Sequence, residues 1–366
     1  MTIRYRVRGG GATAMAAMLL AVFVAALLVA PLAIAPKPPG SGPKPTPPPP
    51  GPADPAVAYT KVTDGLWTLG VMNANGTAAT TLYTVAPAPG NPTLVRHPTW
   101  APDRSALAFT VVRSLAGEVF ELWRIDVTVA NGVVQGTNPL LLHNYPYYQE
   151  EISPAWSPDG TVIAFTEQDA DLYFYWALTK LLRTIPANGG APTTIYTAED
   201  TYGVSDPTWS QAGTEIAWVS TRFIDAAGPN DDYPVLLPVE YSIMVLDLTT
   251  NTTRTVFGPV AHRLDELDWA RTQDKIMFHA PSPVSGIYTV DISQPDPVPQ
   301  LVVSSGYQPS TWLPNDAKIA FNAPEYHFRT GKLIGWPIWT YELSTGQQVR
   351  VGPGFYPDWV RCSPCP

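Results

Sequence analysis

The sequence predicts an all-β protein, a six-bladed β-propeller that occupies residues 56–366. Three observations support this fold class: a tryptophan-centred motif recurs along the chain, turn residues are abundant, and the strands missing from the last repeat stand at the start of the repeat region. Residues 1–35 and 36–55, which precede this region, differ from it in composition and are treated as separate segments.

The recurring motif is a tryptophan followed nine residues later by a second aromatic residue. One copy reads SPAWSPDGTVIAF and contains Trp156 and Phe165. Neighbouring repeat tryptophans are 43 to 60 residues apart, which is typical of a four-stranded blade with variable loops. The repeat tryptophans are Trp100, Trp156, Trp209, Trp269, Trp312 and Trp359.

Each copy of the motif predicts a β-hairpin. Trp156 ends the first strand, and the chain turns at Asp159-Gly160, because glycine accepts a positive φ without steric cost. Residues 161–165 then form the second strand, whose side chains alternate between two faces. A further apolar segment follows in each repeat; in the repeat of Trp156 it is less regular, and Leu181-Leu182 is the expected strand.

The sixth repeat obtains its remaining strands from the start of the repeat region. Trp359 is followed by only seven residues, whereas Val57-Ala58-Tyr59 matches Ile163-Ala164-Phe165 of a complete repeat. We therefore expect residues 56–85 to supply three strands of one blade and the segment at Trp359 to supply the fourth. Such a blade closes the ring and leaves no free sheet edge between the first and last blades.

The segments SPAWSPDGTVIAF and LGVMNANGTAATTLYT resemble the WD40-like repeats of TolB-type β-propellers. The resemblance covers residues 56–366 and implies the propeller fold, but propellers of this kind include scaffolds, peptide binders and enzymes. TolB-type proteins also carry an α/β domain before the propeller. We expect no such domain here, because residues 1–55 have the composition of an anchor and a linker.

The first 35 residues have the composition of a membrane-targeting segment. Arg4, Arg6 and Arg8 precede an uncharged stretch, residues 11–35, whose 25 residues are enough to cross a bilayer as a helix. The two interpretations are a single-pass anchor with its N-terminus in the cytoplasm and a cleaved signal sequence. Both place the propeller outside the cytoplasmic membrane, at the cell envelope, in the periplasm or secreted.

Residues 36–55 contain 11 prolines and should form an extended linker, because proline fixes φ and lacks an amide donor. At the other end, Cys362 and Cys365 are the only cysteines. Export permits a disulfide between them, and inert thiols are the alternative.

The charge of the propeller region restricts its partners. Residues 56–366 hold 17 basic and 30 acidic residues, a net charge of −13. An acidic body of this kind is repelled by a phosphate backbone, so nucleic acid is excluded as a partner. A basic protein or peptide is the more compatible partner.

The topology of a four-stranded blade predicts where a binding site should lie. The loop that enters the first strand and the loop between the second and third strands open on the same face. We therefore expect the residues before the repeat tryptophans to surround the mouth of the central channel, with the long loops 168–179, 222–240 and 323–336 beside them. The candidate partner-binding residues are His97, Glu150, Glu151, Asp206, His262, Asp265, Glu266, Tyr307, Gln308 and Tyr356.

Three functions remain open at this point. The first is a non-catalytic scaffold that holds a protein or peptide partner through this face. The second is a propeller enzyme, a metal-assisted lyase or hydrolase acting on carbohydrate or peptide, with His97, His262 and the mouth carboxylates as metal ligands or as acid and base. The third is a structural subunit of a membrane complex.

Local motifs give no support to catalysis. The sequence contains no G-x-S-x-G, H-E-x-x-H or P-loop motif, and its five histidines are widely spaced. We expect no catalytic residue, no metal and no cofactor. The alternative is Ca²⁺ bound through the oxygen atoms of Asp225, Asp231 and Asp232.

Overall fold

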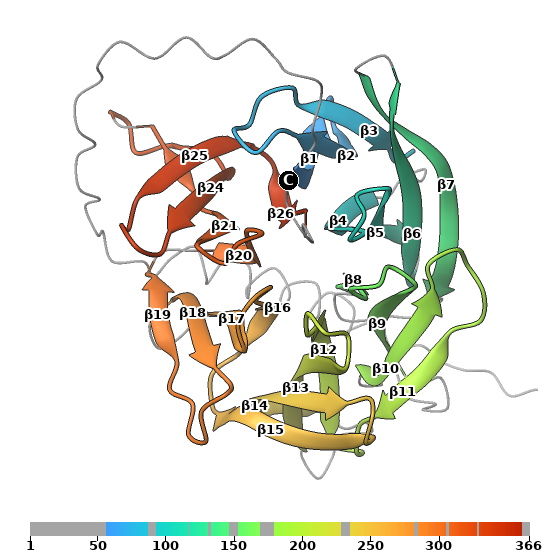
Figure 1. Ribbon diagram of the computed structural model, residues 1–366, viewed down its shortest axis with the longest axis vertical. Coiled ribbons are helices and arrows are strands. Elements are labelled where there is room, and N and C mark those ends of the chain that lie inside the picture. Colours follow the sequence, from blue (N-terminus) through green and yellow to red (C-terminus); the bar gives the residue numbers. More distant parts are fainter. Residues whose placement is uncertain are drawn as a thin grey trace, which may run out of the picture. The chain divides into compact units, whose positions relative to one another are not determined.

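Six four-stranded antiparallel sheets stand in a ring, each with its first strand at the centre (Figure 1). The computed structural model describes residues 56–86, 93–115, 117–130, 133–145, 153–168, 179–227, 235–281, 285–304, 307–327 and 329–360. In these ranges every helix or strand element is a β-strand, and none of these residues forms a helix able to span a membrane. The expected all-β, six-bladed architecture is therefore confirmed.

The blades are numbered here in chain order, and the strands of each are given from the centre outward. Blade 1 consists of β26 (Phe355–Trp359), β1 (Val57–Thr63), β2 (Leu66–Met72) and β3 (Thr80–Thr84). Blade 2 consists of β4 (Thr93–Trp100), β5 (Ala106–Leu115), β6 (Gly117–Ala130) and β7 (Val133–Tyr145). Blade 3 consists of β8 (Ala155–Trp156), β9 (Val162–Gln168), β10 (Thr179–Pro186) and β11 (Thr193–Thr197). Blade 4 consists of β12 (Tyr202–Trp209), β13 (Glu215–Asp225), β14 (Leu236–Asp247) and β15 (Thr252–Val260). Blade 5 consists of β16 (Asp265–Trp269), β17 (Lys275–Ala280), β18 (Gly286–Asp291) and β19 (Gln300–Val303). Blade 6 consists of β20 (Tyr307–Trp312), β21 (Lys318–Asn322), β24 (Pro337–Glu342) and β25 (Gln348–Pro353).

The turn after the repeat tryptophan of blade 3 is stabilised by its own side chains. In blade 3, one carboxylate oxygen of Asp159 accepts from the hydroxyl of Ser157 at 2.6 Å and from the amide of Thr161 at 3.0 Å. These hydrogen bonds, that from Ser157 first, lower the pKa of Asp159. Gly160 follows with a φ of 72°, as the sequence predicts.

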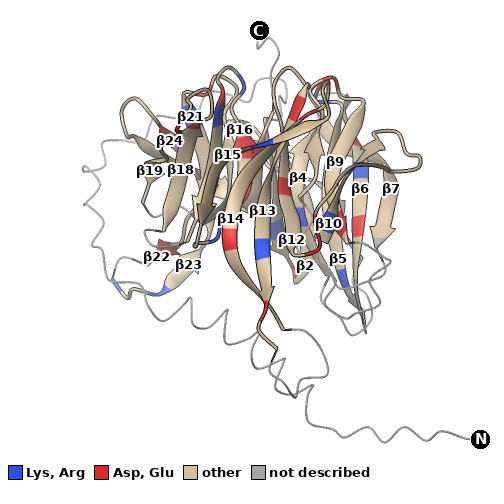
Figure 2. Ribbon diagram, turned by 90° about the horizontal axis from the view of Figure 1, so that it is seen from below, with Lys and Arg blue, Asp and Glu red and all other residues tan. Residues whose placement is uncertain are grey.

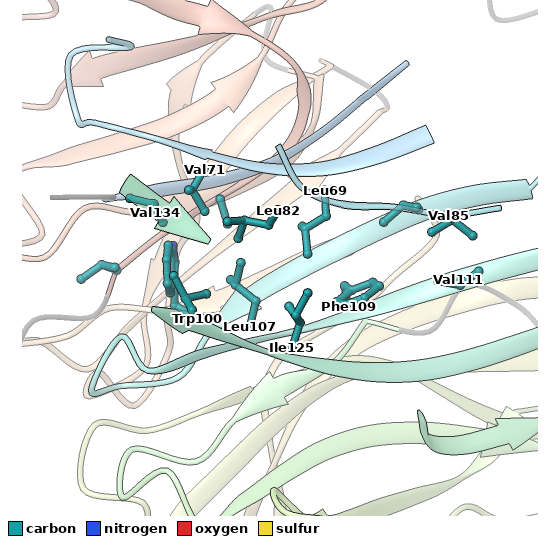
Figure 3. Packing of buried hydrophobic residues seen from close by; sticks show 14 residues of the cluster. Leu69, Val71, Leu82, Val85, Trp100, Leu107, Phe109, Val111, Ile125 and Val134 are labelled. Atoms are coloured by element: carbon teal, nitrogen blue, oxygen red, sulfur yellow. The ribbon is translucent and has the colours of Figure 1, made fainter. Parts of the chain in front are cut away.

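The hydrophobic core lies between the blades, because each second strand presents alternate side chains to its two neighbours. Ile163 and Phe165 pack in the cluster between blades 2 and 3, whereas Ala164 between them packs in the cluster with blade 4. Figure 3 shows the corresponding cluster of blades 1 and 2, which contains Leu69, Val71, Leu82, Trp100, Leu107, Phe109 and Ile125.

The repeat tryptophans also join neighbouring blades by hydrogen bonds. The indole Nε1–H of Trp156 donates to the carbonyl of Thr99 at 3.0 Å, and that of Trp209 donates to the carbonyl of Ala155 at 3.1 Å. In the same way, the indole Nε1–H of Trp312 donates to the carbonyl of Asp268 at 3.0 Å. Burial of a tryptophan contributes about 4–6 kcal/mol at ~25 cal/mol per Å². A phenylalanine would provide apolar area at this position but no donor.

Blade 1 is built from both ends of the chain, as predicted. Val57 of β1 pairs with Trp359 of β26, and Ala58 pairs with Asp358. The amide of Val360 donates to the carbonyl of Ala56 at 2.9 Å. The last strand of the chain thus completes the ring as the innermost strand of the first blade (Figure 1).

Two of the segments expected to be loops are hairpins. Residues 222–225 and 236–240 extend β13 and β14, which pair as far as Asp225 and Leu236, so the prediction of a loop there was wrong. The long β13–β14 hairpin projects from one face of the propeller (Figure 2). Residues 323–336 contain a further two-stranded sheet, β22 (Glu325–Tyr326) and β23 (Leu333–Gly335).

Several predictions concern residues outside the described ranges. They are the anchor or signal sequence in residues 1–35, the proline-rich linker in residues 36–55 and the pair Cys362 and Cys365. Most of the expected loop 168–179 also lies outside them.

Candidate functional site

The innermost strands repeat one local distortion, a bulge at the third residue before the repeat tryptophan. This residue has a positive φ in four blades: His97 (45°), Asp206 (52°), Glu266 (56°) and Tyr356 (53°). The strand register shifts at the same place in each of these blades. A proline follows three of the four residues, and because it lacks an N–H it cannot continue the hydrogen-bond ladder.

These bulges surround a narrow cavity of about 80 Å³ on the propeller axis. His97, Asp206, Glu266 and Tyr356 line it, together with Ser153, which holds the same position in blade 3. Five blades therefore contribute the residue at this position to the lining, and Ser310 and Thr311 line the cavity from the sixth. The blade fold brings them together although they are spread over 260 residues of sequence.

The side chains around the cavity contact one another. The Ser153 hydroxyl donates to Asp206 Oδ1 at 3.2 Å and lies 3.5 Å from His97 Nδ1. His97 Nδ1 lies 3.9 Å from Glu266 Oε2. The rings of His97 and Tyr356 meet edge to face with their centroids 4.6 Å apart. The cavity wall is thus a connected polar cluster with one aromatic side.

A second cavity of about 360 Å³ adjoins the first on the same face. It is lined by apolar and aromatic side chains, including Phe223, Pro238 and Tyr241, and by two arginines, Arg96 and Arg263. Asp206 and Glu266 line both cavities, so these two carboxylates stand where the narrow space meets the wide one.

The electrostatic environment of Asp206 favours its neutral form. Burial raises the pKa of Asp206 to about 6, and the negative charge of Asp265 adds to this effect. A hydrogen bond from Ser205 and the charges of His97 and Arg263 oppose it. Asp265 is itself held between Arg263 Nε at 2.8 Å and His279 Nδ1 at 2.9 Å. Asp206 therefore ionises within the range of pH that proteins ordinarily meet.

The cluster does not have the geometry of a catalytic serine triad. In a triad the histidine contacts the serine through one ring nitrogen and the acid through the other. Here the same nitrogen, His97 Nδ1, faces both Ser153 and Glu266. In the part of the chain that the structure describes, no three His, Cys, Asp or Glu side chains are arranged to hold a metal ion.

The structure places five of the predicted residues at the channel mouth. His97, Asp206, Glu266 and Tyr356 line the narrow cavity, and Asp265 lines the wide one. His262 is not beside His97: it lies seven residues before Trp269, in the bend ahead of β16, and lines neither cavity.

The remaining predictions cannot be placed at the mouth. Glu150 and Glu151 lie outside the described residues, and Tyr307 and Gln308 begin β20 but their side chains lie outside the description. Asp225 Oδ1 accepts from the amides of Ala227 at 2.8 Å and Val235 at 3.0 Å. Asp231 and Asp232 lie outside the described residues, so the calcium alternative stays a prediction.

The sequence does not indicate several of the residues that line the cavities. One of them could have been predicted by counting the same number of residues back from every repeat tryptophan. Counting three residues back from Trp156 selects Ser153 instead of Glu150 or Glu151. Arg263 and Tyr241 reach the wide cavity from a bend and from a third strand, and no repeat position indicates them. His279 is 5% exposed, and its Nε2 has no hydrogen-bond partner among the described residues.

The ring of six four-stranded blades, with a polar cavity on its axis, defines a β-propeller. No family model and no curated protein matches the chain. Among solved structures, TolB from Acinetobacter baumannii is similar with a TM-score of 0.56 at 13% identity, over 85% of this chain and 68% of that one. The putative TolB from Agrobacterium tumefaciens has a TM-score of 0.50 at 14% identity, over 82% of this chain and 92% of that one.

A chain of the nidogen/laminin complex is also similar, with a TM-score of 0.52 at 10% identity over 84% of this chain and 99% of that one. At such low identity these likenesses concern the fold alone. The expected TolB-like propeller fold is confirmed by them.

Proposed function

We propose that this protein is an exported β-propeller that holds a protein or peptide partner at the cell envelope, through its channel mouth and without catalysing a reaction. The TolB-like fold supports a binding scaffold, and the composition of residues 1–35 supports an envelope location. The acidic charge of residues 56–366 supports a basic partner.

The observation that carries this proposal is the pair of adjoining cavities that share Asp206 and Glu266. The narrow cavity, about 80 Å³, has room for the end of one side chain. The wide cavity, about 360 Å³, falls in the range of sites that enclose a small ligand group. This combination suits recognition of a protruding group on a larger molecule.

Exposed apolar side chains on neighbouring hairpins add contact area around the mouth. Ile224 and Leu237 at the end of the β13–β14 hairpin are 41% and 46% exposed. Tyr326 and Ile334 on the β22–β23 hairpin are 57% and 60% exposed. Both hairpins connect second and third strands and project on the same face (Figure 2). Apolar and aromatic groups of this kind are common in protein interfaces.

Partner capture from gently solubilised membranes tests the proposal. The full-length protein is compared with an Asp206→Asn/Glu266→Gln variant, which removes two charges from the mouth and keeps the side-chain shapes. The matched control is Asp274→Asn/Asp296→Asn, which removes two exposed carboxylates from turns that do not line either cavity.

We expect a partner that the wild type and the control retain and that the mouth variant loses. A partner retained equally by all three forms would move the interface to the blade sides or the terminal segments, as the structural-subunit alternative requires. Turnover of a carbohydrate or peptide that depends on His97 would overturn the non-catalytic part of the proposal.

A further inference from the structure

The narrow cavity presents several oxygen acceptors, and His97 lies among them. Its described lining contains no lysine and no arginine, whereas Asp206 and Glu266 enter it from adjacent blades. All four carboxylates of the lining have partners. Asp206 accepts from Ser153 at 3.2 Å, and Glu266 lies 3.9 Å from His97 Nδ1. Asp268 pairs with Arg271 at 2.9 Å, and Asp358 accepts from the amide of Trp100 at 2.7 Å. Asp206 and Glu266 also line the wide cavity, so the junction of the two cavities is acidic.

A buried hydroxyl points independently to a ligand in this space. Ser310 lines the same cavity, is 7% exposed, and its Oγ has no hydrogen-bond partner among the described residues. A buried polar atom without a partner is destabilising, so a donor that reaches this hydroxyl would recover that cost. The ring of Tyr356 forms another part of the wall and can face a cation.

From these groups we infer that the channel mouth binds a primary ammonium group that is carried next to an apolar side chain, as at the free amino terminus of a peptide. The inference rests on the proposed function and specifies the partner. An ammonium group has three N–H donors, and Asp206, Glu266 and Ser310 supply three acceptors. The small volume of the cavity fits this compact cation.

The wide cavity explains why the ammonium group should sit beside an apolar group. Phe223, Pro238, Tyr241 and Leu264 form the apolar part of its lining, and Asp265 with two arginines is in the polar part. The two shared carboxylates stand at its junction with the narrow cavity. At an amino terminus the ammonium group and the first side chain branch from the same carbon, so each can enter one cavity. Arg96 and Arg263, which line the same cavity, can donate hydrogen bonds to the following peptide carbonyls. A lysine side chain offers the same ammonium group on a longer stem.

Binding should strengthen as the pH rises from 5 to 7. The charged or titratable groups around Asp206 come from several blades. They are Asp265, Arg263, Glu266, His97, Arg96 and Tyr241. An ammonium ligand requires an ionised Asp206, and burial holds the pKa of this carboxyl at about 6. At pH 5 the proton on Asp206 removes one of the two shared charges.

The test measures fluorescence anisotropy of labelled hexapeptides with the full-length protein in detergent. One peptide begins with a free leucine amino terminus, a second has the same sequence with an acetylated terminus, and a third is acetylated and carries an internal lysine. We expect the free-amine peptide to bind at least about tenfold more tightly than its acetylated form, a difference of ~1.4 kcal/mol. Asp206→Asn/Glu266→Gln should remove this preference, and Asp274→Asn/Asp296→Asn should keep it.

The peptide series separates the two sources of the ammonium group. Tight binding of the acetylated lysine peptide would assign the site to a lysine side chain, and weak binding would assign it to the amino terminus. Equal binding of the free and acetylated peptides without lysine, or no binding of any peptide, would overturn the inference. In that case a partner that is lost by the mouth variant in membrane capture would still support the proposed function. Circular dichroism of each variant checks that the ring remains folded.

Discussion

The carboxylate of Asp358 accepts a hydrogen bond from the backbone N–H of Trp100 at 2.7 Å, across 258 residues of sequence. Both residues are buried. Two other pairs repeat the contact: Asp268 accepts from the amide of Trp312 at 2.7 Å, and Thr208 accepts from that of Trp269 at 3.0 Å. The residue before one repeat tryptophan thus satisfies the amide of the next, and Asp358 extends this pattern across the closing blade.

Replacement of Asp358 should show how much its hydrogen bond to the amide of Trp100 stabilises the closed ring of blades. Asp358→Ala leaves a buried amide without a partner, and we expect it to lower the free energy of unfolding by about 2–4 kcal/mol. Asp358→Asn keeps an acceptor oxygen and should lower the free energy of unfolding clearly less. Urea unfolding followed by tryptophan fluorescence measures both. Equal losses for the two variants would show that the hydrogen bond contributes little to closure.

Gly76 is required where a loop of blade 1 packs against blade 6. Its φ is 80°, and a Cβ there would lie 1.8 Å from the carbonyl oxygen of Val351. Gly65 has nearly the same φ, 81°, but nothing within 4 Å of its Cβ position. Gly65→Ala should therefore cost only the backbone strain, about 1 kcal/mol, and Gly76→Ala should cost at least ~2 kcal/mol more. Similar midpoints of thermal unfolding for the two variants would contradict the clash.

Asn322 holds the closing strand beside the channel mouth. Its Nδ2 donates to the carbonyl of Gly354 at 2.7 Å, and its Oδ1 accepts from the amide of Tyr356 at 3.1 Å. Asn322→Ala should lower the free energy of unfolding by ~2–4 kcal/mol because both backbone groups lose their partner. Asn322→Asp keeps the acceptor but sets a carboxylate against carbonyl oxygens, so its destabilisation should grow between pH 4 and pH 7. A loss that does not change with pH would argue against this contact.

Asp206 should make the stability of the protein depend on pH. Its pKa rises to about 6 in the folded state from 3.8, so between these values the folded state binds more protons than the unfolded state. Asp206 therefore lowers the free energy of unfolding as the pH rises from 4 to 6. Asp206→Asn should remove this contribution, and the variant should gain stability relative to wild type with rising pH. A stability difference that stays constant from pH 4 to pH 7 would refute the burial of this carboxyl.

The sequence was sufficient for the fold because each blade repeats its determinants. Most blades carry the same three features at equivalent positions, which in blade 3 are Trp156, the turn at Gly160 and the small residue before Phe165. The closing blade is predicted by the match of Val57-Ala58-Tyr59 with Ile163-Ala164-Phe165. Repetition makes these features visible without a structure.

The site was only partly predictable, because it depends on a distortion and on contacts between blades. The positive φ at His97, Asp206, Glu266 and Tyr356 follows from a bulge that the motif spacing does not reveal. In blade 3 the prediction selected the charged residues Glu150 and Glu151, whereas Ser153 is the residue that lines the cavity. The wide cavity collects Tyr241 and Arg263 through packing of blades 4 and 5, so no periodic pattern marks them.

The most direct measurement of the central claim is photo-crosslinking in intact membranes. p-Benzoylphenylalanine replaces either Tyr241, which lines the wide cavity, or Asn188, which lines a groove next to the turn at Gly160 on the opposite face. The channel-mouth account predicts a discrete adduct with a partner from position 241 and none from position 188. An adduct from position 188 alone would contradict it.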